Sequence, residues 1–467
     1  MDDDIFSAAV LSKLPLADSI WRILHHVLAD SWLADLWQRE RGRCYEKMLE
    51  FSTVAHLVTD ALTQHDGSGR QAFERGQEAE KLPVSIGSAY EKLGNLPLPL
   101  SAALLKEGTV RLHELLPVDP TVAPFPLPAS WDGFEVFGAD GKAIKHVKRL
   151  LKPLRGLQAG ILGARASVAL NLRTGTAVGM VGHLDGEAGE AALTQELLPL
   201  MAQAAADKPW LVVLDRLYCN LSFPRRVLQA GGHFLIRYCS NTTFVVDPDR
   251  PAQEGHDARG QRIVQEWGRL GMTKENQALY VRRVTLQLAG GKEISVITDL
   301  LDENAYPAED LLVTYRKRWG IETVFHQITD VFSLHHLIGS SPKAVLFQFS
   351  LCLLMYNALQ VVRAHLANHQ QCEAEKISNE KLFYDVKRQL VSVSELVEMT
   401  SLLDLLGEVT TAAELRDSLH ENLRDAWSKR WWKAPSSGGG GHNKVKTRVL
   451  GNHTSTYRVL QQAKTQT

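Results

Sequence analysis

Cysteine is scarce in this sequence and is not arranged for cross-linking or zinc binding. The 467 residues include five cysteines, and no two of them form a C-x-x-C pair. Their odd number and wide separation exclude a disulfide framework and a zinc site, and they fit a reducing cytosol. We therefore expect a cytoplasmic protein. The cysteines are Cys44, Cys219, Cys239, Cys352 and Cys372.

The sequence also lacks an excess of either charge. Lys and Arg number 52 and Asp and Glu number 53, so the formal net charge is −1. Nucleic-acid-binding proteins are usually basic overall, so any DNA-binding surface here must come from local segregation of charge. The start, MDDDIFSAAV, lacks the basic residues of a signal peptide. The most apolar run, 344–362, is interrupted by Gln348, Asn357 and Gln360, which predicts a buried helix and no membrane span.

The composition is that of a globular protein, 45% hydrophobic and 22% charged, and the length suggests about two to four domains. Helical periodicity predicts a helical N-terminal domain over 1–127 that would bind DNA, although its few basic residues suit a neutral scaffold equally well. We expect an α/β core over 128–239 and 309–369, interrupted by a β-rich insertion at 240–308. A helical C-terminal region, 370–467, would carry a flexible basic tail.

Two predicted core strands end on aspartates. FEVFGAD, 134–140, ends on Asp140, and LVVLD, 211–215, ends on Asp215. In open α/β sheets, sites form at the carboxyl ends of the strands. The segment after Asp140 is basic and begins with Lys142 and Lys145. We expect it to bind a polyanion, the alternative being a solvated surface.

The segment YRKRWGIETVFHQITD, 315–330, is predicted to be a helix. Tyr315, Arg318 and Glu322 fall at i, i+3 and i+7 and therefore share one face. A phenol and a guanidinium there suit the binding of a phosphodiester, while the carboxylate suits a divalent metal. A solvated face with an Arg–Glu ion pair is the alternative interpretation.

Asp140, Asp215 and Glu322 together predict a metal site. Three carboxylates brought together repel one another unless they hold a cation, and hard cations such as Mg²⁺ or Mn²⁺ prefer oxygen ligands. Two such ions about 4 Å apart can activate a water and stabilise the leaving oxygen of a phosphodiester.

These motifs resemble the DDE transposases of the bacterial insertion-sequence four (IS-four) family. The family signature is Y-(2)-R-(3)-E-(6)-K, and this sequence departs from it at Thr329, which stands at the Lys position. The resemblance covers residues 130–365. The matching positions are Asp140 in VFGADG, Asp215 in LVVLDR, Arg237 at the end of HFLIR, and Tyr315, Arg318 and Glu322 in the signature.

The resemblance implies an RNase H-like mixed-sheet core that cleaves transposon ends and transfers the strands into target DNA. It further implies a homodimer that binds double-stranded DNA at the terminal inverted repeats, in the bacterial nucleoid. A DNA-binding protein that no longer cuts and a metal-dependent nuclease without strand transfer are the alternatives. The implied metal ligands are Asp140, Asp215 and Glu322, and the implied DNA contacts are Tyr315, Arg318, Arg237, Lys142 and Lys145.

Overall fold

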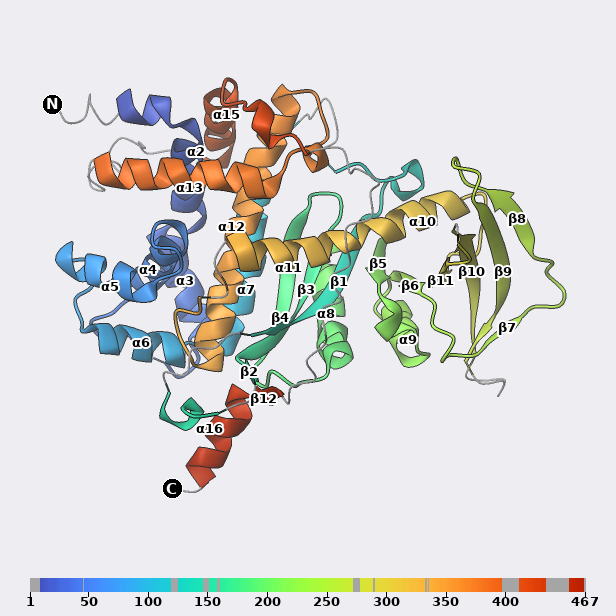
Figure 1. Ribbon diagram of the computed structural model, residues 1–467, viewed down its shortest axis with the longest axis horizontal. Helices are drawn as coiled ribbons and strands as arrows, with labels where there is room; N and C mark the ends of the chain where they lie inside the picture. The colour runs from blue at the N-terminus through green and yellow to red at the C-terminus, as the bar shows by residue number, and fades with distance from the viewer. Residues whose placement is uncertain are drawn as a thin grey trace.

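Five strands form the centre of the fold, which is seen here in a computed structural model (Figure 1). Their order is β4-β3-β1-β5-β6, in which β1, β5 and β6 are parallel and β3 and β4 are antiparallel. This mixed sheet confirms the predicted α/β class. The strands are β1 (Glu135–Ile144), β3 (Ala164–Asn171), β4 (Thr176–His183), β5 (Trp210–Leu214) and β6 (His233–Arg237). The structure describes residues 9–44, 46–118, 125–145, 151–157, 160–271, 278–288, 290–331, 334, 336–396, 411–433 and 453–465.

Strand β1 is longer than predicted. The sequence was expected to leave the strand at Asp140, but β1 continues to Ile144. The reason is that β3 pairs with β1 as far as Ile144, whereas the pairing with β5 stops at Gly138. Asp140 therefore lies beyond the parallel part of the sheet while its backbone is still extended.

Five strands are described between residues 240 and 308, the range of the predicted insertion, and they extend the core sheet. Strand β11 pairs with β6, so core and insertion share one sheet of ten strands. The predicted hairpin at Gly290 and Gly291 joins β10 to β11, and both glycines have positive φ angles, 79° and 73°. The strands are β7 (Phe244–Val246), β8 (Gln253–His256), β9 (Arg262–Leu270), β10 (Leu279–Gln287) and β11 (Glu293–Thr298).

Helices cover both faces of the core sheet (Figure 1). On one face α8 (Glu190–Ala205) packs on β1, β3 and β4, and α9 (Ser222–Gln229) packs on β6. On the other face α10 (Ala308–Lys317), α11 (Trp319–Val331) and α12 (Pro342–His369) contact the strands. In Figure 1, α10 and α11 follow one another from the insertion towards α12.

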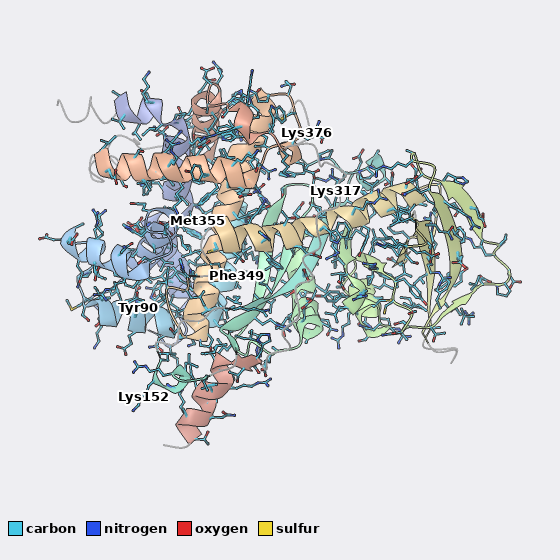
Figure 2. The ribbon with its side chains drawn as sticks, in the orientation of Figure 1. Tyr90, Lys152, Lys317, Phe349, Met355 and Lys376 are labelled. Carbon is cyan, nitrogen blue, oxygen red and sulfur yellow. The ribbon has the colours of Figure 1, made fainter. Side chains whose placement is uncertain are left out.

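Helix α12 is the central helix of the helical half. It is apolar and long enough to cross a membrane, yet its most apolar window is completely buried inside the protein, as predicted for residues 344–362. Figure 2 shows Phe349 and Met355 along it. Helix α7 packs on both α12 and β4, which joins the N-terminal helices to the core. The N-terminal helices are α2 (Pro15–Val27), α3 (Asp30–Glu40), α4 (Phe51–Thr63), α5 (Gly69–Glu78), α6 (Ile86–Asn95) and α7 (Leu98–His113).

The described part of the chain ends with a strand and a helix, and the strand overlaps only the last two residues of the predicted flexible tail, 436–454. Strand β12 (His453–Ser455) pairs in parallel with β2 (Gly160–Leu162), and α16 (Thr456–Thr465) follows it. The preceding part of the predicted tail, 436–452, lies outside the described residues. The remaining helices are α13 (Asn379–Leu396), α15 (Ala412–Leu423), and the short 3-10 turns η1 (Ala129–Trp131), η2 (Lys152–Leu154), η3 (Arg216–Tyr218), η4 (Ala374–Lys376) and η5 (Lys429–Trp431).

Candidate active site

The register of the parallel strands brings the predicted strand-end residues to one level. Val136 pairs with Leu211, and Leu211 pairs with His233. Residues that are an even number of positions apart on a strand point to the same side, which here is the side packed against α11 and α12. The residues four positions further along each strand, at this common level, are Asp140, Asp215 and Arg237.

Glu322 reaches this side of the sheet from a junction between two helices. The structure divides the predicted helix 315–330, because α10 ends at Lys317 and α11 begins at Trp319. At the junction the amide of Arg318 donates to the carbonyl of Tyr315 at 3.1 Å, which is a tighter i→i−3 bond. The junction lies against β1, because a Cβ built on Gly138 would stand 4.0 Å from the Arg318 Cα, which is van der Waals contact.

Arg318 and Tyr315, two of the predicted DNA contacts, are buried. Arg318 is 3% exposed, and its Nη2 donates to Glu322 Oε1 at 2.8 Å. Among the described residues, its Nε and Nη1 and the hydroxyl of Tyr315, which is 2% exposed, meet no hydrogen-bond partner at good geometry, although Arg318 and Tyr315 interact electrostatically with each other. Without DNA, Arg318 and Glu322 therefore form the ion pair of the alternative interpretation, with Arg318 buried and Glu322 exposed. The unpartnered donors are what an incoming phosphate oxygen would need.

A further carboxylate, Glu190, lies beside Asp140. A Cβ on Gly141 would come within 2.4 Å of the Glu190 Cδ, so the carboxyl group stands directly over the backbone next to Asp140. Tyr218, fully buried, donates its hydroxyl to Glu190 Oε1 at 3.1 Å. Sequence reasoning missed Glu190 because a glutamate at the start of a helix is already explained by the helix dipole.

Buried hydroxyl groups join Glu190 to the strand that carries Asp140. The Tyr218 hydroxyl lies 2.9 Å from the Thr194 hydroxyl, which in turn lies 2.7 Å from that of Ser167. Ser167 donates to the backbone carbonyl of Asp140 at 3.4 Å. These buried hydroxyl groups connect the carboxylate of Glu190 to the backbone of β1 at Asp140.

The acidic surroundings perturb Asp140. Burial raises its pKa to about 7, and the neighbouring charge of Glu190 adds to the rise, whereas the Gly141 amide and Arg318 oppose it. Burial, followed by the charge of Glu190, also raises the pKa of Tyr218. A cation between these oxygens would favour the ionised carboxylate of Asp140, against both burial and the charge of Glu190.

The donor set fits a hard divalent cation in its chemistry, since it consists of carboxylate oxygens. Within the described ranges, no three His, Cys, Asp or Glu side chains stand close enough together to hold an ion as they are. Glu322 is held by Arg318, and Asp215 Oδ1 accepts a hydrogen bond from the Leu217 amide at 2.5 Å. Ion binding would therefore require Glu322 to turn away from Arg318.

The remaining predicted DNA contacts lie around these acids. Lys142 is half-buried, and its ammonium stands 5.7 Å from the centre of the Phe325 ring on α11. Arg237 is half-buried and Lys145 is exposed. Thr329, at the position of the family lysine, donates its hydroxyl to the carbonyl of Phe325 at 2.7 Å. The predicted basic segment runs from 142 to 155, and its middle part, 146–150, lies outside the described residues.

Residues 131–358 match the family model of the transposase DDE domain. This stretch of the chain is therefore similar to the transposase DDE domain. It spans β1 to the first half of α12 and so includes Asp140, Asp215 and Glu322. The DDE domain is associated with DNA transposition, which agrees with the predicted class; the finer assignment to the IS-four family remains a prediction.

The chain is also similar to a curated protein of Sinorhizobium fredii (strain NBRC 101917 / NGR234) named "Putative transposase y4zB". The two are 23% identical over 150 residues, which is 32% of this chain and 41% of that protein, so the match spans less than half of either. Among solved structures, the piggyBac transposase synaptic complex with hairpin DNA is 10% identical, with 92% of this chain and 88% of that chain covered. Its TM-score of 0.39 is too low to equate the two folds.

Proposed function

We propose that this protein is a cut-and-paste DNA transposase of the IS-four type, with an RNase H-like core. It would cleave the ends of a transposon and join the freed 3′ ends to target DNA. One observation carries the proposal. Asp140 and Asp215 lie at one level of the sheet, on the side against which the helix of Glu322 packs, and all three belong to the stretch that matches the DDE domain.

Asp140, Asp215 and Glu322 would hold Mg²⁺ or Mn²⁺, and two ions suit this number of carboxylates. A bound ion of this kind activates a water and stabilises the leaving oxygen of a phosphodiester. Glu190 adds a carboxylate to the side of Asp140, where the hydrogen bond from Tyr218 keeps it oriented. The Gly141 amide donates to Asp140 Oδ1 at 2.9 Å and fixes that carboxylate in turn.

Arg318 would change partner when DNA binds. In the free protein it neutralises Glu322, and it is held at the α10–α11 junction with two unpartnered donor groups. A phosphate at the site would accept hydrogen bonds from these donors and from Tyr315, which would release Glu322 for the metal. Lys142, beside Phe325, supplies a positive charge close to Thr329 and would replace the missing lysine.

Arg237 and Lys145 would complete the contacts to the backbone of double-stranded DNA. Because a transposon has two ends, we propose a homodimer that pairs the two terminal repeats. The site of action would be the bacterial cytoplasm, on nucleoid DNA.

The first test replaces the acids singly, as Asp140→Asn, Asp215→Asn and Glu322→Gln. Each change removes a charge that would bind the metal while conserving size, so cleavage of end DNA should fall at least about 100-fold with binding retained. Exposed Asp207 serves as the control, because Asp207→Asn should cleave normally. The DNA is taken from the inverted repeats that flank the gene.

Wild-type cleavage by Asp215→Asn would refute the assignment of these ligands. If wild-type protein binds end DNA but never cuts it, the protein is a DNA-binding relic. A strand-transfer assay with pre-cut ends separates a transposase from a nuclease, because a nuclease would leave those ends unjoined.

A further inference from the structure

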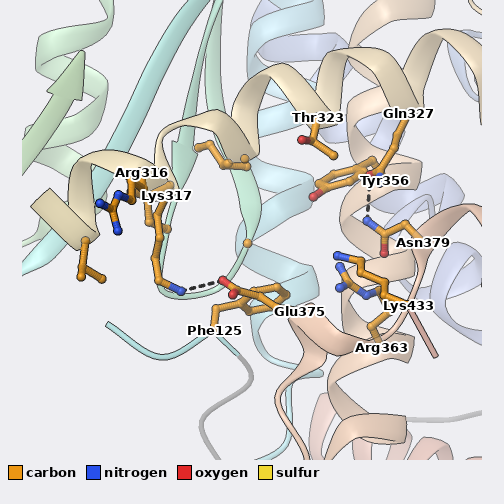
Figure 3. A pocket seen from close by; sticks show the side chains of 15 residues that line it. Phe125, Arg316, Lys317, Thr323, Gln327, Tyr356, Arg363, Glu375, Asn379 and Lys433 are labelled. Atoms are coloured by element: carbon orange, nitrogen blue, oxygen red, sulfur yellow. Dashed lines mark hydrogen bonds and ion pairs between the residues drawn. The ribbon is translucent and has the colours of Figure 1, made fainter. Parts of the chain in front are cut away.

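A pocket of about 480 Å³ opens behind the α10–α11 junction (Figure 3). Its walls come from the turn between β3 and β4, from α10, α11 and α12, and from the C-terminal region around η4 and α13. On α11 it is lined by Gly320, Thr323 and Gln327. These positions lie about 100–200° around the helix axis from Glu322, so the pocket and the candidate active site occupy different sides of α11.

The pocket is strongly cationic. Of the residues that line it, Arg316, Lys317, Arg363 and Lys433 are basic and Glu375 alone is acidic. Glu375 Oε1 pairs with Lys317 Nζ at 2.8 Å. Three positive charges therefore remain in the pocket without a lining acid to balance them, in a chain whose overall net charge is only −1.

Two of these cations meet at the inner end of the pocket. Figure 3 shows Arg363 and Lys433 side by side, close to Asn379. Arg363 is 3% exposed, and it donates from Nη2 to the carbonyl of Ile377 at 3.0 Å. Its Nε has no hydrogen-bond partner, and neither has Asn379 Oδ1. Burial and, after it, the like charge of Arg363 lower the pKa of Lys433, whereas the charge of Glu375 opposes the shift.

The chemistry of the lining selects a phosphate group attached to a larger molecule. The cations provide charge-assisted donors for an anion, and Thr323 and Gln327 add neutral polar groups. Phe125 and Tyr356 supply apolar surface against which a sugar or base would pack. A carboxylate ligand would leave much of this volume and most of the donors unused.

We propose that this pocket binds a backbone phosphate of the DNA strand that reaches the active site, a proposal that rests on the proposed function. A helix with its side chains is about 10–12 Å across. Phosphates on one strand of B-DNA are spaced by about 3.4 Å along the duplex axis. Because the strand also winds around that axis, phosphates about two nucleotides apart already span the width of the helix, so the phosphate in the pocket lies about two nucleotides from the one beside Glu322.

The test uses full-length protein with Lys433→Ala and Arg316→Ala, two cations that pair with no acid in the described part of the chain. DNA affinity is titrated at several salt concentrations. Each variant should bind several-fold more weakly at low salt, and the slope of log K against log salt should fall by about one unit. Exposed Lys13 lies outside the pocket, so Lys13→Ala should leave the slope unchanged.

A second measurement locates the contact on the DNA. Neutral methylphosphonate linkages are placed singly along the strand, and the one about two nucleotides from the cleavage site should weaken wild-type binding. The same linkage should cost Lys433→Ala nothing further, because the contact is already gone. An unchanged salt slope in both variants would overturn the proposal.

The source of the phosphate is tested with inorganic phosphate and with a mononucleotide, at matched ionic strength. These ligands could raise the melting temperature of wild type but not of Lys433→Ala, while Lys433→Ala leaves the salt slope of DNA binding unchanged. The pocket would then be a site for a free anion, which also overturns the proposal. Failure of the proposed function would look different, since wild-type protein would then not cleave DNA although the Lys433 effect on binding could persist.

Discussion

Tyr218 is the residue that holds Glu190 in place, through a hydroxyl that also contacts Thr194. Tyr218→Phe conserves the buried ring and removes only this hydrogen bond. Groups that orient metal ligands typically change metal affinity about 10–100-fold. We expect Mn²⁺ affinity, measured by electron paramagnetic resonance, to fall about tenfold in Tyr218→Phe and further in Glu190→Gln. Tyr384 is 62% exposed, so Tyr384→Phe is the control that should bind as wild type.

His365 should make the stability of the helical half depend on pH. Its ring is fully buried, and Nε2 lies 2.9 Å from the carbonyl of Leu115, between α12 and the end of α7. Burial lowers the pKa of His365 from 6.5 to about 4. Between pH 6.5 and 4, His365 binds a proton more tightly in the unfolded chain than in the folded protein. Its contribution to the free energy of unfolding is therefore complete above pH 6.5 and is lost as the pH falls to 4. The loss amounts to about 3 kcal/mol at most.

Urea unfolding at pH 7.5 and 4.5 measures this loss. His365→Gln keeps a neutral donor for Leu115 and removes the titrating group, so its free energy of unfolding should fall less between the two pH values. Exposed His256 is the control, and His256→Gln should keep the wild-type dependence. An identical dependence in His365→Gln would show that other groups govern it.

At the scale of elements, Gly141 determines how closely β1 approaches the start of α8. A methyl group there would collide with the carboxyl end of Glu190, which is flexible and can move aside. Gly141→Ala should therefore leave the unfolding free energy within about 1 kcal/mol of wild type. Its Mn²⁺ affinity should drop as in Glu190→Gln. A methyl group added at Gly189 would have nothing within 4 Å, so Gly189→Ala should leave metal binding intact.

The strands of the core could be predicted from the sequence because each is a short apolar run followed by a polar residue. Asp215 directly follows β5 as expected, and the hairpin between β10 and β11 follows from its two glycines. Glu190 could not be predicted, since its contact with Asp140 depends on how α8 packs across β1, β3 and β4. The division at Arg318 could not be predicted either, because it lies where the chain packs against β1, a contact between residues far apart in the sequence.

At the scale of the whole molecule, contacts between distant parts of the chain determine how the elements are arranged, which the local sequence pattern does not predict. The insertion was predicted as β-rich, but only the pairing of β11 with β6 shows that it continues the core sheet. Helices far apart in the chain likewise meet around α12, whose apolar run predicted burial without predicting its neighbours. The predicted DNA contacts Tyr315 and Arg318 are buried because α10 and α11 lie directly on that sheet.

The C-terminal segment 453–465 provides the last test at this scale, because it returns to the core next to the basic segment. Strand β12 pairs with β2, and Ser455 Oγ accepts a hydrogen bond from the Gly186 amide at 3.1 Å. Arg458 Nε pairs with Asp185 at 2.8 Å. Helix α16 also packs on η2, at the end of the basic segment.

Removing residues 453–467 should therefore loosen β2, η2 and the turn at Asp185 while the ten-stranded sheet stays folded. Hydrogen exchange measures this directly: amides of 160–162 and 185–187 should lose protection, and those of β5 and β6 should keep it. DNA affinity should fall about several-fold, because ordering the basic segment on DNA then costs more conformational entropy. Arg458→Ala removes one ion pair and should show a smaller loss at 185–187 alone. Unchanged exchange at 160–162 in the truncated protein would mean that β12 does not support β2.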